Sequence, residues 1–116
     1  MRHKKGERIG AILCGEEEGG KKLLKFLGYG VYDGDEVPPK GGGFMQDAMN
    51  ETGNTNPKLV LDNGKVVWGC QCWWGTEAAV RKQIEGYEKH GYEVVVVDME
   101  EEMQKEVKKS EKAERN

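Results

Sequence analysis

Apolar residues occur along this chain in short runs separated by glycine, a pattern typical of a small sheet built from short strands. Residues 8–14 form the first run, and the segment 15–20, bounded by glycines, ends it. A second run follows at residues 21–27. Two apolar runs joined by a glycine-rich segment predict a β-hairpin at the start of the fold.

A third strand is predicted at residues 29–32, directly after the hairpin. Gly28, Gly30 and Gly34 lie in and around it. A glycine inside a strand pattern usually marks a bulge, a bend or a close approach of two backbones. We therefore expect the sheet to be strongly curved in this region.

Residues 36–57 form a long excursion that contains all three prolines of the chain and the glycine run at 41–43. Only residues 44–50 of this segment can form a short helix. Glycines before a helix are one element of a phosphate-binding loop, but the run lacks the Gly-Lys-Ser/Thr ending of that motif. We interpret it as a loop.

The strongest local signal is Asn63-Gly64, which lies between the apolar runs 59–61 and 65–68. Asn-Gly favours the positive φ angles of a type I′ turn, so it predicts a two-residue hairpin. In that register Leu61 is opposite Val66 and Leu59 is opposite Trp68, and cross-strand partners share a face of the sheet.

This register divides the side chains around the hairpin between two faces. The face expected in the core holds Leu59, Leu61, Val66, Trp68, Cys70, Cys72 and Trp74, provided that the strand continues unbroken through Gly69. The other face holds Val60, Val67, Gln71 and Trp73, together with an Asp62–Lys65 pair. Trp73 is thus the tryptophan expected to be exposed, unless a second layer covers it.

The C-terminal half alternates helix and strand. Thr76 is a good N-cap for a helix at 77–90, with Val80, Ile84 and Tyr87 on one stripe and Gly91 after it. Residues 92–98 contain four consecutive valines and predict a strand buried on both faces, and the strand-helix-strand order permits parallel pairing. Residues 99–116 form a charged tail, for which we expect a helix carrying Met99, Met103 and Val107 on one thin apolar stripe.

Length and charge narrow the classes of protein. A chain of 116 residues fits a single domain, which we place at residues 1–98, followed by the tail at 99–116. The net charge of −3, with both signs interspersed, is not the basic field that drives nucleic-acid binding. No run of eighteen apolar residues is present, so no membrane span is expected. Three cysteines do not make a secreted disulfide framework, which favours the cytoplasm.

The cysteines raise the question of a metal site. Cys70 and Cys72 project from the same side of the predicted strand, and Cys14 with His90 could complete a tetrahedral zinc site. No Cys-x-x-Cys knuckle supports that arrangement. We favour Cys70 and Cys72 as small apolar residues of the core, with no metal and no cofactor.

Catalytic constellations are few. The only serine is Ser110 in the tail, and the only histidines are His3 and His90, which excludes a Ser-His-Asp triad. Asp33 and Asp35 belong to an acidic turn that is too sparse for a calcium loop. No residue is assigned a catalytic role.

Two segments carry a resemblance to other proteins. GYGVYDGDEVPP at 28–39 and NPKLVLDNGKVVWGCQCWWG at 56–75 resemble segments of a group of small uncharacterised proteins from bacteria and their phages. The resemblance covers roughly residues 8–98. It implies an accessory cytoplasmic protein, and it brings no activity, ligand or site residue with it.

These observations predict an α+β fold: a mostly antiparallel, barrel-like sheet of five or six strands, one packed helix and a charged C-terminal helix. We expect a non-enzymatic cytoplasmic binding protein, a monomer or weak homodimer, that recognises a protein partner or a small molecule. The expected binding residues are Trp73, Gln71, Val67, Val60, Tyr29 and Tyr32. Two alternatives stay open: a zinc or thiol protein built on Cys14, Cys70 and Cys72, and a small enzyme using carboxylates such as Asp33, Asp35 and Asp98.

Overall fold

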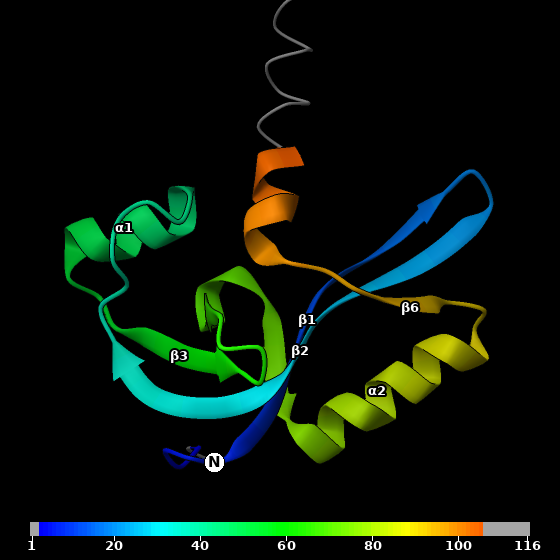
Figure 1. The fold of residues 1–116 in the computed structure, drawn as a ribbon, viewed down its shortest axis with the longest axis horizontal. Coiled ribbons are helices and arrows are strands. Elements are labelled where there is room, and N and C mark those ends of the chain that lie inside the picture. The colour runs from blue at the N-terminus through cyan, green and yellow to red at the C-terminus, as the bar shows by residue number, and fades with distance from the viewer. Residues whose placement is uncertain (1–2, 106–116) are drawn as a thin grey trace, which may run out of the picture.

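The computed structural model describes residues 3–105, and within them the chain forms an α+β fold with a six-stranded sheet (Figure 1). The elements in chain order are β1 (Arg8–Glu18), β2 (Lys21–Glu36), α1 (Phe44–Thr52), β3 (Asn56–Leu61), β4 (Val66–Trp68), the 3₁₀ helix η1 (Gly69–Gln71), β5 (Trp73–Thr76), α2 (Glu77–Lys89) and β6 (Glu93–Val96). Residues 99–105 are also helical. The predicted fold class is confirmed.

The sheet is open. Its strands lie in the order β4-β3-β2-β1-β5 with antiparallel pairing, and β6 adds to β2 in parallel. The expected curvature is present, since β2 bends through a wide arc in Figure 1, but the sheet does not close into a barrel. The last strand pairs in parallel, as the strand-helix-strand order permits, but its partner is β2 and not β5, the strand before α2.

The two strands predicted at 21–27 and 29–32 are one continuous strand, β2. The reason is that pairing with β1 runs on through Gly28 as far as Val31. The glycines nevertheless mark the bends: one register shift lies next to Gly28, and another, between Tyr32 and Asp35, spans Gly34.

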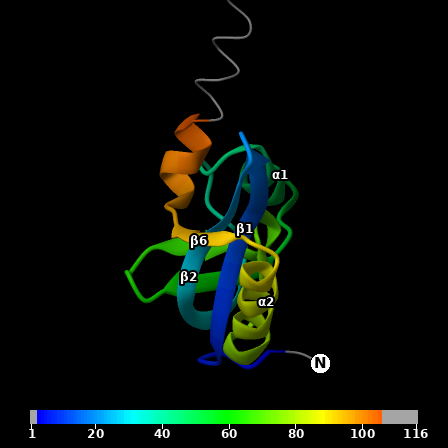
Figure 2. The ribbon, with the colours of Figure 1, turned by 90° about the vertical axis from the view of Figure 1, so that its right-hand side faces the viewer.

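Alternation along β1 and β2 gives the sheet two apolar faces. The inner cluster, inside the curve of the sheet, is made by buried Ile9, Ala11, Leu27, Leu59, Leu61 and Val67. The outer cluster, under α2, is made by buried Ile12, Leu24, Phe26 and Val80. Figure 2 shows α2 lying along β1 on the outer side.

Helix α2 forms where the sequence predicts it. The Ala79 N–H donates to the Thr76 hydroxyl at 3.2 Å, so Thr76 is the N-cap, and Gly91 follows the helix with φ of +87°. Val80 is fully buried and Ile84 packs beside it.

The prediction that residues 92–98 form a strand buried on both faces is wrong. Val96 is 70% exposed, because β6 is a short strand paired with β2 alone.

The predicted register of the β3–β4 hairpin is wrong by one residue. Val66 lies opposite Val60, and Val67 lies opposite Leu59. The Leu61 N–H donates to the Lys65 carbonyl, and the Gly64 N–H donates to the Leu61 carbonyl, both at 2.8 Å. These bonds enclose a three-residue loop, in which only Gly64 has a positive φ. This is a type I turn followed by a left-handed glycine and not the type I′ turn.

Side-chain chemistry explains the shift in register. The Asn63 side chain accepts a hydrogen bond from the Lys65 N–H at 2.9 Å, which closes a local turn of its own. One residue of shift exchanges the faces. Val67, expected on the exposed face, is 2% exposed in the inner cluster, and Val66, expected in the core, is 42% exposed. The Asp62–Lys65 pair does not form; each side chain has another partner.

The strand after β4 is also interrupted. The prediction of an unbroken strand through Gly69 is wrong, because residues 69–71 form η1. The Gln71 side chain stabilises the break by accepting a hydrogen bond from the Trp68 N–H at 3.0 Å. Cys72 and Trp74 still pack against the inner cluster, and Trp68 is buried, as expected.

No helix within residues 3–105 is long and apolar enough to cross a membrane.

Candidate functional site

The structure separates the six residues that the sequence groups into one binding face. Val67 is in the inner cluster and Val60 is half-buried. The Gln71 amide donates to the Gly42 carbonyl and to the Gln46 side chain, each at 3.1 Å, so it belongs to the η1–α1 contact. The physical reason is the change in register together with the 3₁₀ turn.

The two tyrosines lie in different places. The Tyr32 ring stacks on Trp74 with centroids 5.7 Å apart, and its hydroxyl donates to Asp35 at 2.6 Å. Tyr29 lies on the outer side, where its ring packs edge-on against Phe26, with the Arg81 guanidinium 4.8 Å from the ring centroid. Neither tyrosine joins Trp73.

Trp73 is 53% exposed, as the sequence leads one to expect. It is the first residue of β5 and pairs with Ile12 of β1, so its ring lies on the outer side of the sheet. Helix α2 covers the outer cluster there but leaves the Trp73 ring in contact with solvent. The exposed aromatic surface is therefore fixed to a strand and not to a loop.

Two further aromatic rings lie beside this position. Tyr87, on the last turn of α2, and Tyr92, just before β6, pack edge-to-face with centroids 5.0 Å apart. Both rings lie over Gly15 of β1, where an added Cβ would be 3.6 and 3.5 Å from them. The Lys22 ammonium group is 5.7 Å from the Tyr92 centroid, within reach of a cation–π contact.

We call the surface formed by Trp73, Tyr87 and Tyr92 the aromatic groove. It contains two hollows, of about 320 Å³ and about 480 Å³, that share Tyr87 and Gln83. The first is lined by Ile12, Leu13, Cys14, Gly15, Gln83, Tyr87 and Trp73. The second is lined by Lys22, Gln83, Gly86, Tyr87, His90 and Tyr92. The two hollows form one continuous, mostly apolar surface.

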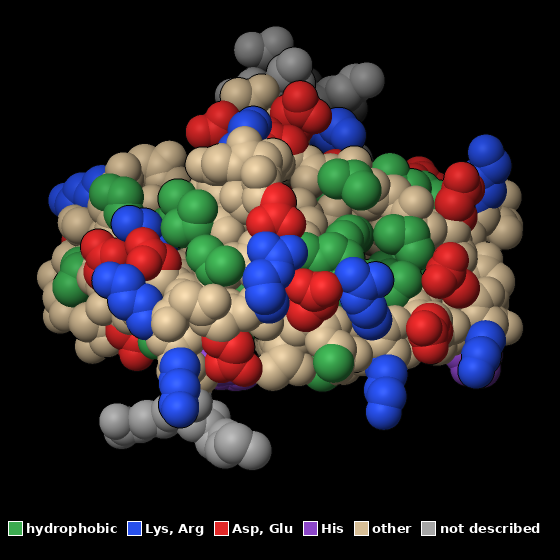
Figure 3. All heavy atoms as spheres, turned by 60° about the horizontal axis from the view of Figure 1, so that its bottom comes forward, with side chains coloured by type: hydrophobic (Ala, Val, Ile, Leu, Met, Phe, Trp, Pro, Cys, Tyr) green, Lys and Arg blue, Asp and Glu red, His purple; other side chains and the backbone are tan. Residues whose placement is uncertain are grey.

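Charged side chains on one face of the molecule are mixed in sign. On the face shown in Figure 3, Lys, Arg, Asp and Glu side chains alternate, with apolar side chains between them. The face in Figure 3 therefore presents no extended positive field of the kind that holds a phosphate backbone.

A separate cavity of about 440 Å³ lies between the loop before α1, the β3–β4 hairpin and the helical residues 99–105. Several of its polar groups have partners within the protein. Gln46 and Gln71 bond to each other, and the Lys65 ammonium group pairs with Asp98 at 2.7 Å. Lys65 lowers the pKa of Asp98, which keeps the carboxylate charged. The Lys65–Asp98 pair joins the β3–β4 hairpin to the start of the helical residues 99–105, and the Gln46–Gln71 bond joins α1 to η1.

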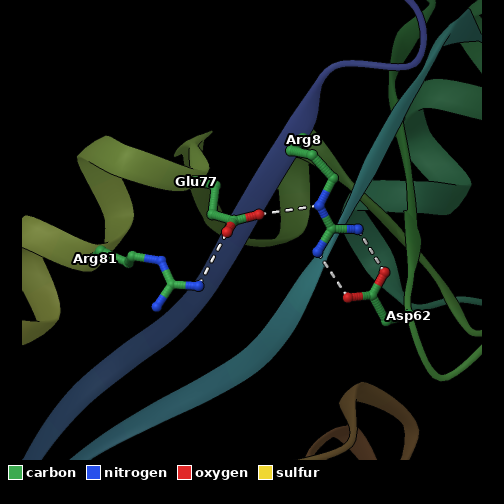
Figure 4. Close-up of polar contacts among 4 residues, drawn as sticks. All are labelled: Arg8, Asp62, Glu77 and Arg81. Carbon is green, nitrogen blue, oxygen red and sulfur yellow. Dashed lines mark hydrogen bonds and ion pairs between the residues drawn. The ribbon is translucent and has the colours of Figure 1, made fainter.

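Arg8 makes the densest polar contact of the surface (Figure 4). Its guanidinium donates two hydrogen bonds to Asp62, at 2.7 and 2.8 Å, and one to Glu77, at 2.9 Å. Glu77 also accepts a bond from Arg81 at 3.0 Å. Arg8 lowers the pKa of Asp62, and Arg81 together with Arg8 lowers that of Glu77. The cluster ties the β3–β4 turn and the start of α2 to β1.

Two of the three thiols, those of Cys70 and Cys72, are poorly suited to reaction as thiolates. Burial raises the pKa of Cys72 to about 12 and also raises that of Cys70, so neither is a ready thiolate at neutral pH. Within residues 3–105, no three His, Cys, Asp or Glu side chains are arranged to hold a metal ion.

The carboxylates proposed for an enzyme are dispersed. Asp33 faces Lys5 and Lys58, Asp35 accepts the bond from Tyr32, and Asp98 is held charged by Lys65. A general acid needs a raised pKa, and the pKa of Asp98 is lowered.

Comparison with known proteins returned no match among family models, curated proteins or solved structures. The candidate site therefore depends on geometry. The sequence predicted the exposure of Trp73 but not its aromatic neighbours, since Tyr87 fits the buried stripe of α2 and Tyr92 fits the valine-rich strand. The sequence signal that could have revealed them is the five-residue spacing of Tyr87 and Tyr92 across the end of α2 at Gly91. In the structure both rings lie on the same side of β1, over Gly15.

Proposed function

We propose that this chain is a non-enzymatic cytoplasmic binding protein that holds a protein partner through the aromatic groove. The observation that carries the proposal is the half-exposed Trp73 ring, fixed on β5 beside the Tyr87–Tyr92 pair. Binding hot spots are enriched in tryptophan and tyrosine, because these side chains bury a large area with few rotatable bonds.

The groove resembles a protein-binding surface more than a small-molecule pocket. Its two hollows lie side by side around Tyr87 and are open to solvent, so a ligand there would follow the surface. Pockets for small molecules instead enclose most of the ligand. An accessory role in bacteria or their phages agrees with the resemblance of residues 28–39 and 56–75.

No described contact favours the two rival functions. The zinc or thiol protein needs accessible thiolates, and the Cys70 and Cys72 pKa values move in the opposite direction. The carboxylate enzyme needs acids gathered in one cleft, and Asp33, Asp35 and Asp98 each take part in separate contacts.

The test is selection of a displayed random-peptide library on the purified protein, followed by affinity measurements on the selected peptides. Trp73→Ala should weaken their binding by about 30-fold, the effect of losing one hot-spot residue. Phe44→Ala is the matched control, because Phe44 is 85% exposed and lies on α1, away from the groove. Failure to select any peptide, or peptides that bind Trp73→Ala as tightly as wild type, would overturn the proposal.

A further inference from the structure

The aromatic groove borders an open strand edge. Strand β5 pairs with β1 only from Ile9 to Ile12. Beyond that point the same edge of β1 continues through Gly15 to Glu18, and no strand within residues 3–105 pairs with it there. In Figure 1 this part of the β1–β2 hairpin projects from the body of the protein.

The open edge has regular geometry. Pairing of β1 with β2 is continuous from Gly15–Leu24 to Glu18–Lys21, and the connecting Gly19 and Gly20 have φ of +59° and +82°, as a type I′ turn requires. In a regular antiparallel strand, alternate residues direct both N–H and C=O away from the paired neighbour. A short row of backbone donors and acceptors is thus available to an added strand.

The open edge and the groove are in line. A strand added antiparallel to β1 would lie end to end with β5, whose first residue is Trp73. The residue opposite Gly15 would share its face, which is the face of Tyr87 and Tyr92. Because Gly15 has no side chain, the hollow beside Trp73 has room for the side chain of that residue.

Charge determines the kind of partner. Glu16 pairs with Lys25 at 3.1 Å. Glu17 and Glu18 lie opposite Lys22 and Lys21 in register but form no ion pair within the described part of the chain. A second copy of this chain, added edge to edge, would bring these carboxylates against one another, and like charges across strands destabilise pairing. A basic strand would instead be attracted.

We propose that the partner adds a short basic β-strand to the Gly15–Glu18 edge of β1, with an apolar side chain in the hollow beside Trp73. This inference rests on the proposed function, since it uses the same groove. It specifies the partner as an extended, lysine- or arginine-rich segment recognised mainly through its backbone.

The probe is a fluorescent heptapeptide of alternating lysine and valine, added to the full-length protein. We expect saturable binding and slower hydrogen exchange at alternate amides of Gly15–Glu18. The same peptide with every second amide N-methylated should not bind, because it cannot complete the ladder. Glu17→Gln with Glu18→Gln should weaken binding about fivefold. The matched double variant, Glu100→Gln with Glu101→Gln, should leave it unchanged.

The outcomes separate the two proposals. If library-selected peptides bind in a Trp73-dependent way but the Lys-Val peptide does not bind, or binds without slowing exchange at Gly15–Glu18, the strand-addition inference is overturned and the proposed function stands. An alternating Glu-Val peptide that binds equally well would overturn the basic character of the partner. If no peptide of either origin binds, both proposals fail together.

Discussion

The β1–β2 and β3–β4 hairpins both turn at glycine, but one presents an open strand edge and the other packs into the inner cluster. The β1–β2 hairpin turns at Gly19-Gly20 with both φ angles positive, whereas the β3–β4 hairpin turns through residues 62–64 with only Gly64 positive. The second turn is anchored by Arg8 on Asp62 and by Asp98 on Lys65. Its strands also supply Leu59, Leu61 and Val67 to the inner cluster.

Within residues 3–105, no ion pair anchors Glu17, Glu18 or Lys21 at the tip of the first hairpin, although Glu16 and Lys22 behind the tip have partners. Residues 15 and 17–21 are exposed, and the charged side chains among them are Glu17, Glu18 and Lys21. The difference shows that a glycine turn determines where a hairpin forms, but not whether that hairpin packs into the core. Burial of the flanking side chains decides whether the hairpin stabilises the core or presents an open edge.

A methyl group added at Gly30, where β2 faces the β3–β4 hairpin, and one added at Gly15, on the open edge of β1, should give the largest contrast in stability. A Cβ on Gly30 would lie 2.2 Å from the Val60 carbonyl oxygen and 2.6 Å from the Leu61 Cα, and backbone atoms cannot move aside. Gly30→Ala should therefore cost about 3 kcal/mol of unfolding free energy. Gly15→Ala makes only ordinary contacts and should change stability by less than about 0.5 kcal/mol. Urea denaturation compares the two, and equal losses would contradict the comparison.

The register of the β3–β4 hairpin can be tested with adjacent valines. Val67→Ala removes a methyl pair from the inner cluster and should cost about 2 kcal/mol. Val66→Ala acts on a side chain that is 42% exposed and should cost less than about 0.5 kcal/mol. Chemical denaturation of both variants measures the difference. The type I′ register predicts the reverse order, so that result would restore it.

Acid should weaken the anchored hairpin through the Arg8 cluster. Arg8 lowers the pKa of Asp62 and contributes to the lowered pKa of Glu77, so the folded state binds fewer protons than the unfolded chain as the pH falls. The stabilisation is complete above the ordinary carboxyl pKa of about 4 and is lost as the pH falls through the lowered values.

Arg8→Gln should therefore melt below wild type at pH 7, and the two Tm values should converge as the pH falls through the lowered pKa values of Asp62 and Glu77. Thermal melts across this pH range are the measurement. A Tm difference that stays constant with pH would show that Arg8 acts through packing and not through its ion pairs.

Local signals in the sequence predicted most elements. Thr76 and Gly91 bounded α2 correctly, and the glycines of β2 marked its bends. The register of β3–β4 could not be obtained from Asn63-Gly64 alone, because a two-residue and a three-residue loop share that signal. The choice depended on the Asn63 side chain and on burial of Val67.

The candidate site was only partly predictable for the same reason. Exposure of Trp73 agrees with the sequence-based expectation, although part of the register behind that expectation was wrong. The 3₁₀ helix η1 lies between β4, whose register was predicted wrongly, and β5. The face on which each β5 side chain lies therefore does not depend on the register of β4. The groove itself depends on long-range contacts of Tyr87 and Tyr92 with Gly15, which no local pattern contains.

The most direct test of the account is a thermal melt of Trp73→Ala beside Trp68→Ala, with peptide affinity measured on the folded variants. Trp68 is buried, so its truncation should cost about 3 to 5 kcal/mol. Trp73→Ala should keep nearly the wild-type Tm and lose about 30-fold in affinity for the selected peptides. If Trp73→Ala melts as early as Trp68→Ala, or binds those peptides like wild type, Trp73 is a packing residue and the aromatic groove is not the binding site.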